Sequence, residues 1–309
     1  MDRIRRVSIV GMGALGILYG DFFAGTLGQE QVTFLADSDR VKNYKDHPVY
    51  CNDREWKFQV QDGAVPDSRG AAQLILFAVK ATALEAAARA VKNQVGKDTI
   101  ILSVLNGISS EEVIGHILGR EHMLYCVAQG MDAVKLGNRL TYSHMGEICI
   151  GIPESEAEKE PLLKKVTDLF DETGLPYTRE ADILRRLWCK WMLNVGVNQA
   201  VMVAEGTYGT VQKPGKERHM MMDAMAEVVA LAEKENIQVT GEDLQSYVDL
   251  VDTLNPEGMP SMRQDGLAHR RSEGEFFAGT VIRKAEKHGL DVTVNRELYQ
   301  RITEMEKAY

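Results

Sequence analysis

The sequence predicts an α/β fold in which an N-terminal parallel-sheet domain is followed by an all-helical C-terminal domain. The 309 residues exceed what one hydrophobic core usually serves, so two domains are expected. Short apolar runs alternate with helical segments up to about residue 180, which is typical of βαβ units. Beyond residue 182 the periodicity is almost entirely helical. We therefore place the domains at residues 1–180 and 181–309, with the boundary near 178–182.

The first four apolar runs are predicted to be core strands that end at a glycine or a polar residue. These ends are Gly11 after residues 5–10, Asp37 after 32–36, Lys80 at the end of 71–80, and Asn106 with Gly107 at the end of 98–107. Helices are expected over about 14–27, from 81 to Val91, and over 109–118, where Ser109 or Ser110 would be the N-cap. This alternation is the basis of the predicted parallel sheet.

Weaker signals complete the first domain. Residues 40–70 are polar and mixed, with only a weak hairpin signal around Asn52 and Asp53. Residues 140–152 are expected to form further strands that close the sheet, and 160–174 an amphipathic helix ended by Gly174. In the second domain strand-like runs are short and isolated, so that domain is expected to be helical.

The composition excludes several classes of protein. Apolar residues make up 44% and charged residues 26%, as in an ordinary soluble globular protein. The net charge of −9 argues against nucleic acid or an anionic membrane as a partner. No apolar stretch is long enough to span a membrane. The cysteines lie in no CxxC pair, so we expect inert thiols in the cytoplasm and no metal site, rather than a redox or zinc role; they are Cys51, Cys126, Cys149 and Cys189.

The turn after the first predicted strand reads GxGxxG and consists of Gly11, Met12, Gly13, Ala14, Leu15 and Gly16. The first glycine allows the turn, the second lets the backbone approach a pyrophosphate, and the third lets the helix pack on the strand. The helix N-terminus adds unpaired N–H groups and the positive end of its dipole. A strand before it and a helix after it favour a dinucleotide site in a Rossmann-type domain. The alternative is a structural turn.

Asp37 bears on which dinucleotide binds. It follows the second predicted strand, 21 residues after Gly16. A carboxylate there can accept hydrogen bonds from both ribose hydroxyls of NAD and would repel a 2′-phosphate, which favours NADH. Arg40 lies close by and could reach a phosphate if the loop folds back. The favoured interpretation of Arg40 is a solvated charge on a helix face.

A second group of polar residues lies on the predicted helix within residues 186–203. Lys190, Asn194 and Asn198 are spaced i, i+4, i+8, which places them along one face. Their neighbours are mostly apolar, and a helix that is apolar all round is usually buried. The stripe either lines a cleft, which we favour, or faces water. A lysine partly withdrawn from water is a usable proton donor near neutral pH.

A third group lies within residues 260–295. Taken singly, Ser261 after Pro260 is most simply a helix cap, and Glu273 a first-turn acid that favours the helix dipole. A helix is predicted from about Glu275 to His288.

Together these stretches resemble the ketopantoate reductase family (2-dehydropantoate 2-reductases). The motifs that carry the resemblance are GMGALG, FAVK, LNG, KWMLNVGVN, PSMRQD with a glutamate 12 residues after its serine, and KHGLDVTVN, in this order. The resemblance implies a Rossmann domain and a helical domain with the active site in the cleft between them. It also implies that NADPH reduces 2-dehydropantoate, a small 2-oxo acid, to pantoate in the route to pantothenate and coenzyme A.

The resemblance also implies roles for individual residues. Lys190 would be the general acid, and Glu273 would contact the cofactor and support the lysine. Lys80 would contact the cofactor, and Asn106 both cofactor and substrate. Asn194, Asn198 and Ser261 would bind substrate, and the backbone of Ala133 would touch the nicotinamide end.

This chain departs from the family at several positions. Family members often have arginine where Asp37 stands, so the family favours NADPH and Asp37 favours NADH. Tyr208 stands where an asparagine often contacts substrate, Gly258 where a polar residue is common, and Ala278 where an asparagine is frequent. These departures leave two alternatives: a reductase of another 2-oxo acid on the same scaffold, and a dinucleotide sensor without catalysis. The apolar C-terminal helices either bury a homodimer face or fill the core.

Overall fold

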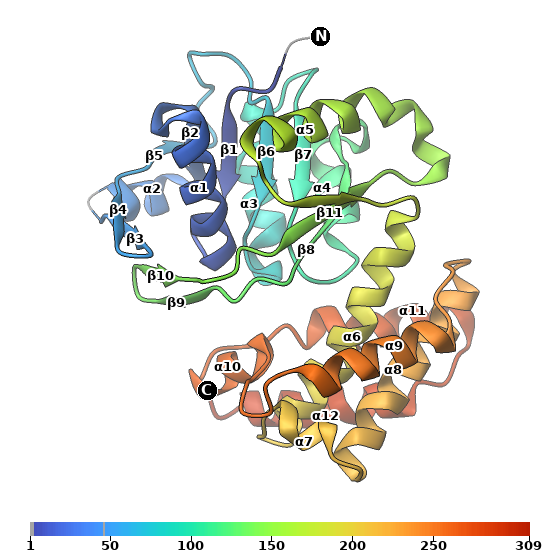
Figure 1. Cartoon of the computed structure of the whole chain (residues 1–309). Coiled ribbons are helices and arrows are strands. Elements are labelled where there is room, and N and C mark those ends of the chain that lie inside the picture. Colours follow the sequence, from blue (N-terminus) through green and yellow to red (C-terminus); the bar gives the residue numbers. More distant parts are fainter. Residues whose placement is uncertain (1–2, 46) are drawn as a thin grey trace. The chain divides into compact units, whose positions relative to one another are not determined.

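The computed structural model describes residues 3–45 and 47–309. The chain divides into two compact units, the first ending at Ile183 and the second beginning at Leu184. The first unit contains the sheets and the second is built from helices (Figure 1). This is the predicted fold class. No helix in the described part of the chain combines the length and the apolar character needed to cross a membrane.

A parallel sheet forms the centre of the first unit, with strand order β5-β2-β1-β6-β7. The strands are β1 (Val7–Val10), β2 (Val32–Ala36), β5 (Gln59–Asp62), β6 (Leu74–Phe77) and β7 (Ile100–Ser103). Val10 pairs with Leu35 on one side and with Phe77 on the other, and Phe77 pairs with Ser103. The carboxyl ends of β2, β1, β6 and β7 therefore lie in register along one edge of the sheet.

Both faces of this sheet are covered, which explains why β1, β2, β6 and β7 are almost entirely buried. One core cluster joins alternate strand residues to α1 (Ala14–Leu27) and α5 (Glu160–Thr173). The other joins the remaining strand residues to α3 (Leu84–Ala90) and α4 (Ser110–Leu118). Short 3-10 turns flank these helices at η1 (Gln29–Gln31), η2 (Ala81–Ala83), η3 (Lys92–Gln94) and η4 (Arg120–His122).

Two small sheets complete the first unit. The hairpin of β3 (Val49–Cys51) and β4 (Arg54–Trp56) turns at Asn52 and Asp53, which have φ of 45° and 65°, so the weak hairpin signal is confirmed. This hairpin continues into β10 (Arg139–Thr141) and β9 (Val134–Leu136), whereas β11 (Glu147–Gly151) lies between β8 (Tyr125–Gln129) and β12 (Tyr177–Arg179). The expectation that residues 140–152 close the main sheet is therefore wrong, because β10 and β11 pair within these smaller sheets. Between β11 and α5 lies η5 (Glu154–Lys159), and Gly174, at φ 73°, ends α5 as predicted.

Helices account for all regular structure in the described residues 184–309. They are α6 (Ile183–Val203), α7 (Tyr208–Gln212), α8 (Lys216–Lys234), α9 (Gly241–Thr253), α10 (Ser261–Leu267), the π-helix η6 (Glu275–Gly279), α11 (Thr280–His288) and α12 (Thr293–Glu306). Fully buried methionine, valine and alanine side chains of α8 form much of the interior, among them Met221, Met225 and Val228. A capping box between Thr240 and Asp243 begins α9.

Candidate active site

The glycine-rich turn leads from β1 into α1. Gly11 has φ of 105°, and a Cβ there would lie 2.7 Å from the carbonyl oxygen of Ala78. A Cβ on Gly16 would overlap the carbonyl oxygen of Gly11. A Cβ on Gly13 would meet only the Ala78 oxygen, at an ordinary 3.6 Å. Gly11 and Gly16 are therefore required by the packing of the protein itself, whereas Gly13 leaves open space in which a ligand can approach the backbone.

The N-terminus of α1 fits an anion. Its N-cap, Gly13, has no side chain to accept hydrogen bonds from the first turn, and that turn carries no acidic residue. The first helical bond runs from the Ile17 N–H to the Gly13 carbonyl, at 3.0 Å. The N–H groups before Ile17 and the positive end of the helix dipole can therefore serve a phosphate. The residues present fit the pyrophosphate of a dinucleotide.

Asp37 stands directly before α2 (Ser38–Lys45), a helix that lies in the polar stretch after β2. Its carboxylate accepts a hydrogen bond from the Arg40 backbone N–H at 2.9 Å and from the Arg40 guanidinium at 2.5 Å. These contacts, with the backbone N–H of Arg40 contributing most, hold the pKa of Asp37 below its usual value. Arg40 is an exposed charge on α2, as predicted, and it also forms an ion pair with Asp37.

Lys80 and Asn106 follow β6 and β7 at equivalent positions. Each comes three residues after the strand end, and the paired strand ends are Phe77 and Ser103. The sheet register therefore brings both to the edge that carries the glycine turn and Asp37. Ala133 lies elsewhere in the first unit, directly before β9 and partly buried against the core.

The segment that carries Asn106 is closed by side chains at its two ends. The Ser103 hydroxyl donates to the Ser110 hydroxyl at 2.8 Å, and Ser110 donates to the Glu111 carboxylate at 3.0 Å. Ser109 occupies the N-cap position of α4 without a side-chain hydrogen bond. The predicted position of the N-cap at Ser109 is therefore confirmed, but no side-chain hydrogen bond accompanies it, and Ser110 joins the buried chain instead. Burial raises the pKa of Glu111 to about 7.

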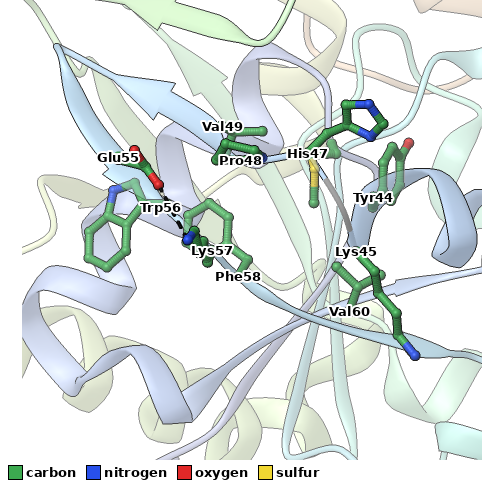
Figure 2. A pocket seen from close by; sticks show the side chains of 11 residues that line it. Tyr44, Lys45, His47, Pro48, Val49, Glu55, Trp56, Lys57, Phe58 and Val60 are labelled. Atoms are coloured by element: carbon green, nitrogen blue, oxygen red, sulfur yellow. Dashed lines mark ion pairs between the residues drawn. The ribbon is translucent and has the colours of Figure 1, made fainter.

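A cavity of about 300 Å³ lies beside the glycine turn and shares Met12 with it. Figure 2 shows its other walls, which come from the end of α2, the β3–β4 hairpin and the start of β5. Lys57 faces Glu55 across 3.8 Å, and the rings of Trp56 and Phe58 stack with centroids 5.3 Å apart. Apart from Met12, sequence reasoning singled out none of these residues, because the walls come from separate elements that carry no shared motif.

The second unit places the polar residues of α6 on one face. Asn198 donates to Asn194 through its side-chain amide at 3.2 Å. The Asn198 side-chain oxygen accepts from the Ser261 hydroxyl at 3.4 Å and from the Met262 backbone N–H at 3.3 Å. The expectation of a Ser261 cap is wrong, since Ser261 is the first residue of α10 and its hydroxyl reaches Asn198 instead. Lys190 is partly exposed and lies one turn before Asn194.

Glu273 lies two residues before η6, whose first turn carries Glu275 as its acidic residue, so the interpretation of Glu273 as a first-turn acid is wrong. The helix predicted from about Glu275 to His288 follows it. That helix begins with the π-helix η6 and continues as α11 to His288. The carbonyl of Glu273 accepts from the backbone N–H groups of Phe276 and Phe277 at 2.9 and 3.1 Å. The indole N–H of Trp191, the residue after Lys190, donates to the Phe276 carbonyl at 3.1 Å. Hydrogen bonding thus ties the Glu273 segment to α6.

Two of the departures from the family pattern contact each other. The Tyr208 backbone N–H donates to the Gly258 carbonyl at 2.9 Å. A Cβ at Gly258 would lie 3.1 Å from the Tyr208 ring. Burial raises the pKa of the Tyr208 hydroxyl. Tyr208 and Gly258 therefore pack against each other, and glycine at position 258 leaves room for the tyrosine ring.

Solved structures of known proteins share this fold. D-mandelate dehydrogenase in complex with NADH and anilino(oxo)acetate superposes with a TM-score of 0.85 at 22% identity, over 98% of this chain and 98% of its own. Dimeric ketopantoate reductase from Staphylococcus aureus gives 0.80 at 19% identity, over 98% of this chain and 99% of its own. At these identities the likeness concerns the fold alone.

Sequence relatives are more specific. The chain is 27% identical to 2-dehydropantoate 2-reductase of Halobacterium salinarum, over 95% of this chain and 96% of that protein. It is 26% identical to the Vibrio cholerae enzyme of the same name, over 77% and 79%. Family profiles described as "Ketopantoate reductase PanE/ApbA" and "Ketopantoate reductase PanE/ApbA C terminal" match residues 7–155 and 182–306. From the glycine turn to the last helix, this chain belongs to the ketopantoate reductase family.

Proposed function

We propose that this chain is a 2-dehydropantoate 2-reductase that uses a nicotinamide dinucleotide to convert the C2 ketone of 2-dehydropantoate into the hydroxyl of pantoate. One observation carries the proposal: in a member of this family, Asn194, Asn198 and Ser261 are joined by hydrogen bonds on the helix face that also carries Lys190. A lysine beside neutral donors and acceptors suits a reaction in which negative charge develops on a carbonyl oxygen.

The first unit is proposed to hold the cofactor, which when bound supplies a hydride from the reduced nicotinamide ring. Backbone N–H groups of the glycine turn and the start of α1 bind the pyrophosphate, with Gly13 giving the closest approach. Asp37 accepts hydrogen bonds from the adenosine ribose. Lys80, Asn106 and the backbone of Ala133 contact the remaining part of the dinucleotide, and Asn106 also contacts substrate.

The second unit is proposed to supply the acid. Lys190 donates a proton to the ketone oxygen and stabilises the charge that forms there. Asn194, Asn198 and Ser261 bind the hydroxyl and carboxylate groups of the substrate and orient its carbonyl. Glu273 contacts the cofactor and keeps the lysine in its ammonium form, since a neighbouring carboxylate favours the charged amine.

The cofactor preference is proposed to be a modest one for NADH. Asp37 repels a 2′-phosphate, but the Arg40 guanidinium bonded to it offsets much of its charge. We expect kcat/KM with NADH to exceed that with NADPH by less than about a hundredfold, and Asp37→Arg to shift the preference toward NADPH. A strong NADPH preference in the unmodified protein would contradict this assignment of Asp37.

The decisive experiment follows the loss of reduced-nicotinamide absorbance with 2-dehydropantoate, with a panel of other 2-oxo acids, and with no oxo acid. The proposal expects the highest kcat/KM with 2-dehydropantoate. A higher value with another oxo acid would reassign the substrate, and cofactor binding without turnover would indicate a sensor. We also propose that the protein is cytoplasmic and forms a homodimer, which cell fractionation and light scattering of the purified protein will test.

A further inference from the structure

The segment that follows Glu273 has an unusual backbone. In η6 the Gly279 N–H donates to the Gly274 carbonyl, five residues earlier, at 3.1 Å. An α-helix would assign this carbonyl to the N–H of Ala278, so the π-turn leaves that N–H without its usual acceptor. Ala278 is fully buried, and a buried N–H without a partner is costly.

Gln199 of α6 supplies the missing acceptor. Its side-chain oxygen accepts the hydrogen bond of the Ala278 N–H at 3.1 Å. Its amide nitrogen donates to the Val195 carbonyl at 2.7 Å and to the side-chain oxygen of Asn295 at 3.3 Å. Both the oxygen and the nitrogen of the Gln199 side-chain amide are therefore hydrogen-bonded, and the residue is completely buried. Its conformation is fixed by the helices around it, which makes it a rigid support for the π-turn.

The network extends beyond Gln199 to a buried helix start. Asn295 donates from its side chain to the Ala224 carbonyl at 3.2 Å and to the Glu227 carboxylate at 2.7 Å. Glu227 also accepts the backbone N–H groups of Val294 and Asn295 at 2.8 and 2.9 Å, so it caps α12. Three helices, α6, α8 and α12, thereby share in holding one residue of the π-turn.

A second residue of α6 holds the other end of the same segment. Trp191 is fully buried and donates to the Phe276 carbonyl at 3.1 Å. Trp191, Val195 and Gln199 are spaced four residues apart, one residue after Lys190, Asn194 and Asn198. On an α-helix the two stripes lie about 100° apart. One stripe of α6 carries the proposed acid and substrate ligands, and its neighbour holds the segment that carries Glu273.

We infer that Gln199 and Trp191 are positioning residues that fix the Glu273 π-turn against α6 and thereby set the placement of the Glu273 carboxylate toward Lys190. The inference rests on the proposed function, in which Glu273 supports the lysine. Hydrogen bonds of the residues adjacent to Lys190 and Asn198 reach the segment three and five residues after Glu273, so a shift of the π-turn moves the carboxylate relative to the amine.

The test compares Gln199→Met with Gln212→Met in the full-length protein. Gln212 is a matched control in the same unit, since its side-chain amide, like that of Gln199, donates two hydrogen bonds; its acceptors are the backbone carbonyls of Val251 and Leu254, both at 2.8 Å. We expect Gln199→Met to lower kcat about tenfold and to move the alkaline limb of the kcat–pH profile about one unit lower, because a more distant carboxylate stabilises the ammonium less. Gln212→Met should leave both unchanged at a similar loss of Tm.

Trp191→Phe keeps the ring, removes only the N–H, and serves if Gln199→Met does not fold. We expect Trp191→Phe to move the alkaline limb of the kcat–pH profile to lower pH, by less than Gln199→Met does. The inference is overturned if Gln199→Met and Trp191→Phe both fold and keep the wild-type pH profile. It is also overturned if the control Gln212→Met shows the same shift as Gln199→Met. In either case the proposed function stands. No reduction of 2-dehydropantoate by the unmodified protein instead overturns the proposed function, and with it the assignment of these two residues.

Discussion

The two units carry their candidate residues in opposite ways. In the first unit the proposed pyrophosphate contacts depend on backbone and on absent side chains, because the glycine turn can approach a phosphate only where no Cβ intervenes. In the second unit it depends on side chains that project from one helix face and bond one another. Cofactor binding by the first unit should therefore be weakened by substitutions that add atoms to the glycine turn. Catalysis by the second unit should be weakened by substitutions that remove side-chain groups.

The largest effect is expected in the second unit, from Lys190→Ala. Removing the proposed general acid should lower kcat by at least about a hundredfold, while the affinity for reduced cofactor, measured by fluorescence titration, stays near wild type. Lys164→Ala is the control, since Lys164 is an exposed lysine of α5 paired with Asp168. Near-normal turnover by Lys190→Ala would reject the assignment.

The next largest effect is expected on cofactor affinity, from adding a methyl group to the glycine turn of the first unit. Gly13→Ala should fold with a nearly unchanged Tm, because the new methyl group meets only the Ala78 oxygen at 3.6 Å. Its Kd for the cofactor should rise about tenfold or more, since the methyl group occupies the approach to the pyrophosphate. Gly16→Ala should instead lose stability, since its methyl group overlaps the Gly11 oxygen. Equal cofactor affinity in Gly13→Ala and wild type would show that the turn is only structural.

A smaller effect is expected from the buried carboxyl at the start of α4. Burial raises the pKa of Glu111 to about 7, so the native state keeps a proton that the unfolded chain loses above about pH 4. The free energy of unfolding should therefore fall as the pH rises from about 4 to about 7, by as much as about 3 kcal/mol. Urea unfolding at several pH values should show that Glu111→Gln removes this dependence. An unchanged slope in the variant would assign the dependence to other groups.

The smallest effect is expected from the exposed carboxylate of Asp37. Its lowered pKa means that its contribution to stability is present above about pH 4, the unfolded value, and is lost as pH falls below it. Asp37→Asn keeps the cap on α2 and should cost less than about 1 kcal/mol at pH 7, because solvent screens the pair with Arg40. The difference from wild type should shrink as the pH falls below about 4. A constant difference across this range would exclude the ionised carboxylate as its source.

Elements with a strong local pattern were predictable, and those defined by distant partners were not. The helix over 14–27 and the strand over 32–36 have the predicted bounds, because their apolar residues and flanking glycines act locally. The strand β5 was missed because Gln59–Asp62 is polar and mostly half-exposed. The π-turn of η6 was missed because its defining acceptor, Gln199, lies 79 residues from Ala278.

The candidate site shows the same division. The spacing of Lys190, Asn194 and Asn198 gave their common face, since helical periodicity alone determines it. The buried chain from Ser103 to Glu111 follows from the packing of β7 and α4. The ion pair of Asp37 with Arg40 is local, three residues apart at the start of a helix, and its sequence signal was the spacing itself. A cap was the simplest local role for Ser261 and Ser110, and a distant or neighbouring side chain competed successfully for each hydroxyl.

The contact between Tyr208 and Gly258 constrains how this protein can change over generations. A side chain at position 258 would place its Cβ 3.1 Å from both the Tyr208 ring and the carbonyl oxygen of Asn255, so these neighbours must shift to admit it. Because positions 208 and 258 touch, the effects of replacing them are expected to be coupled, and libraries that vary one position at a time do not sample combinations in which both change. Pairwise randomisation of 208 with 258 would sample those combinations.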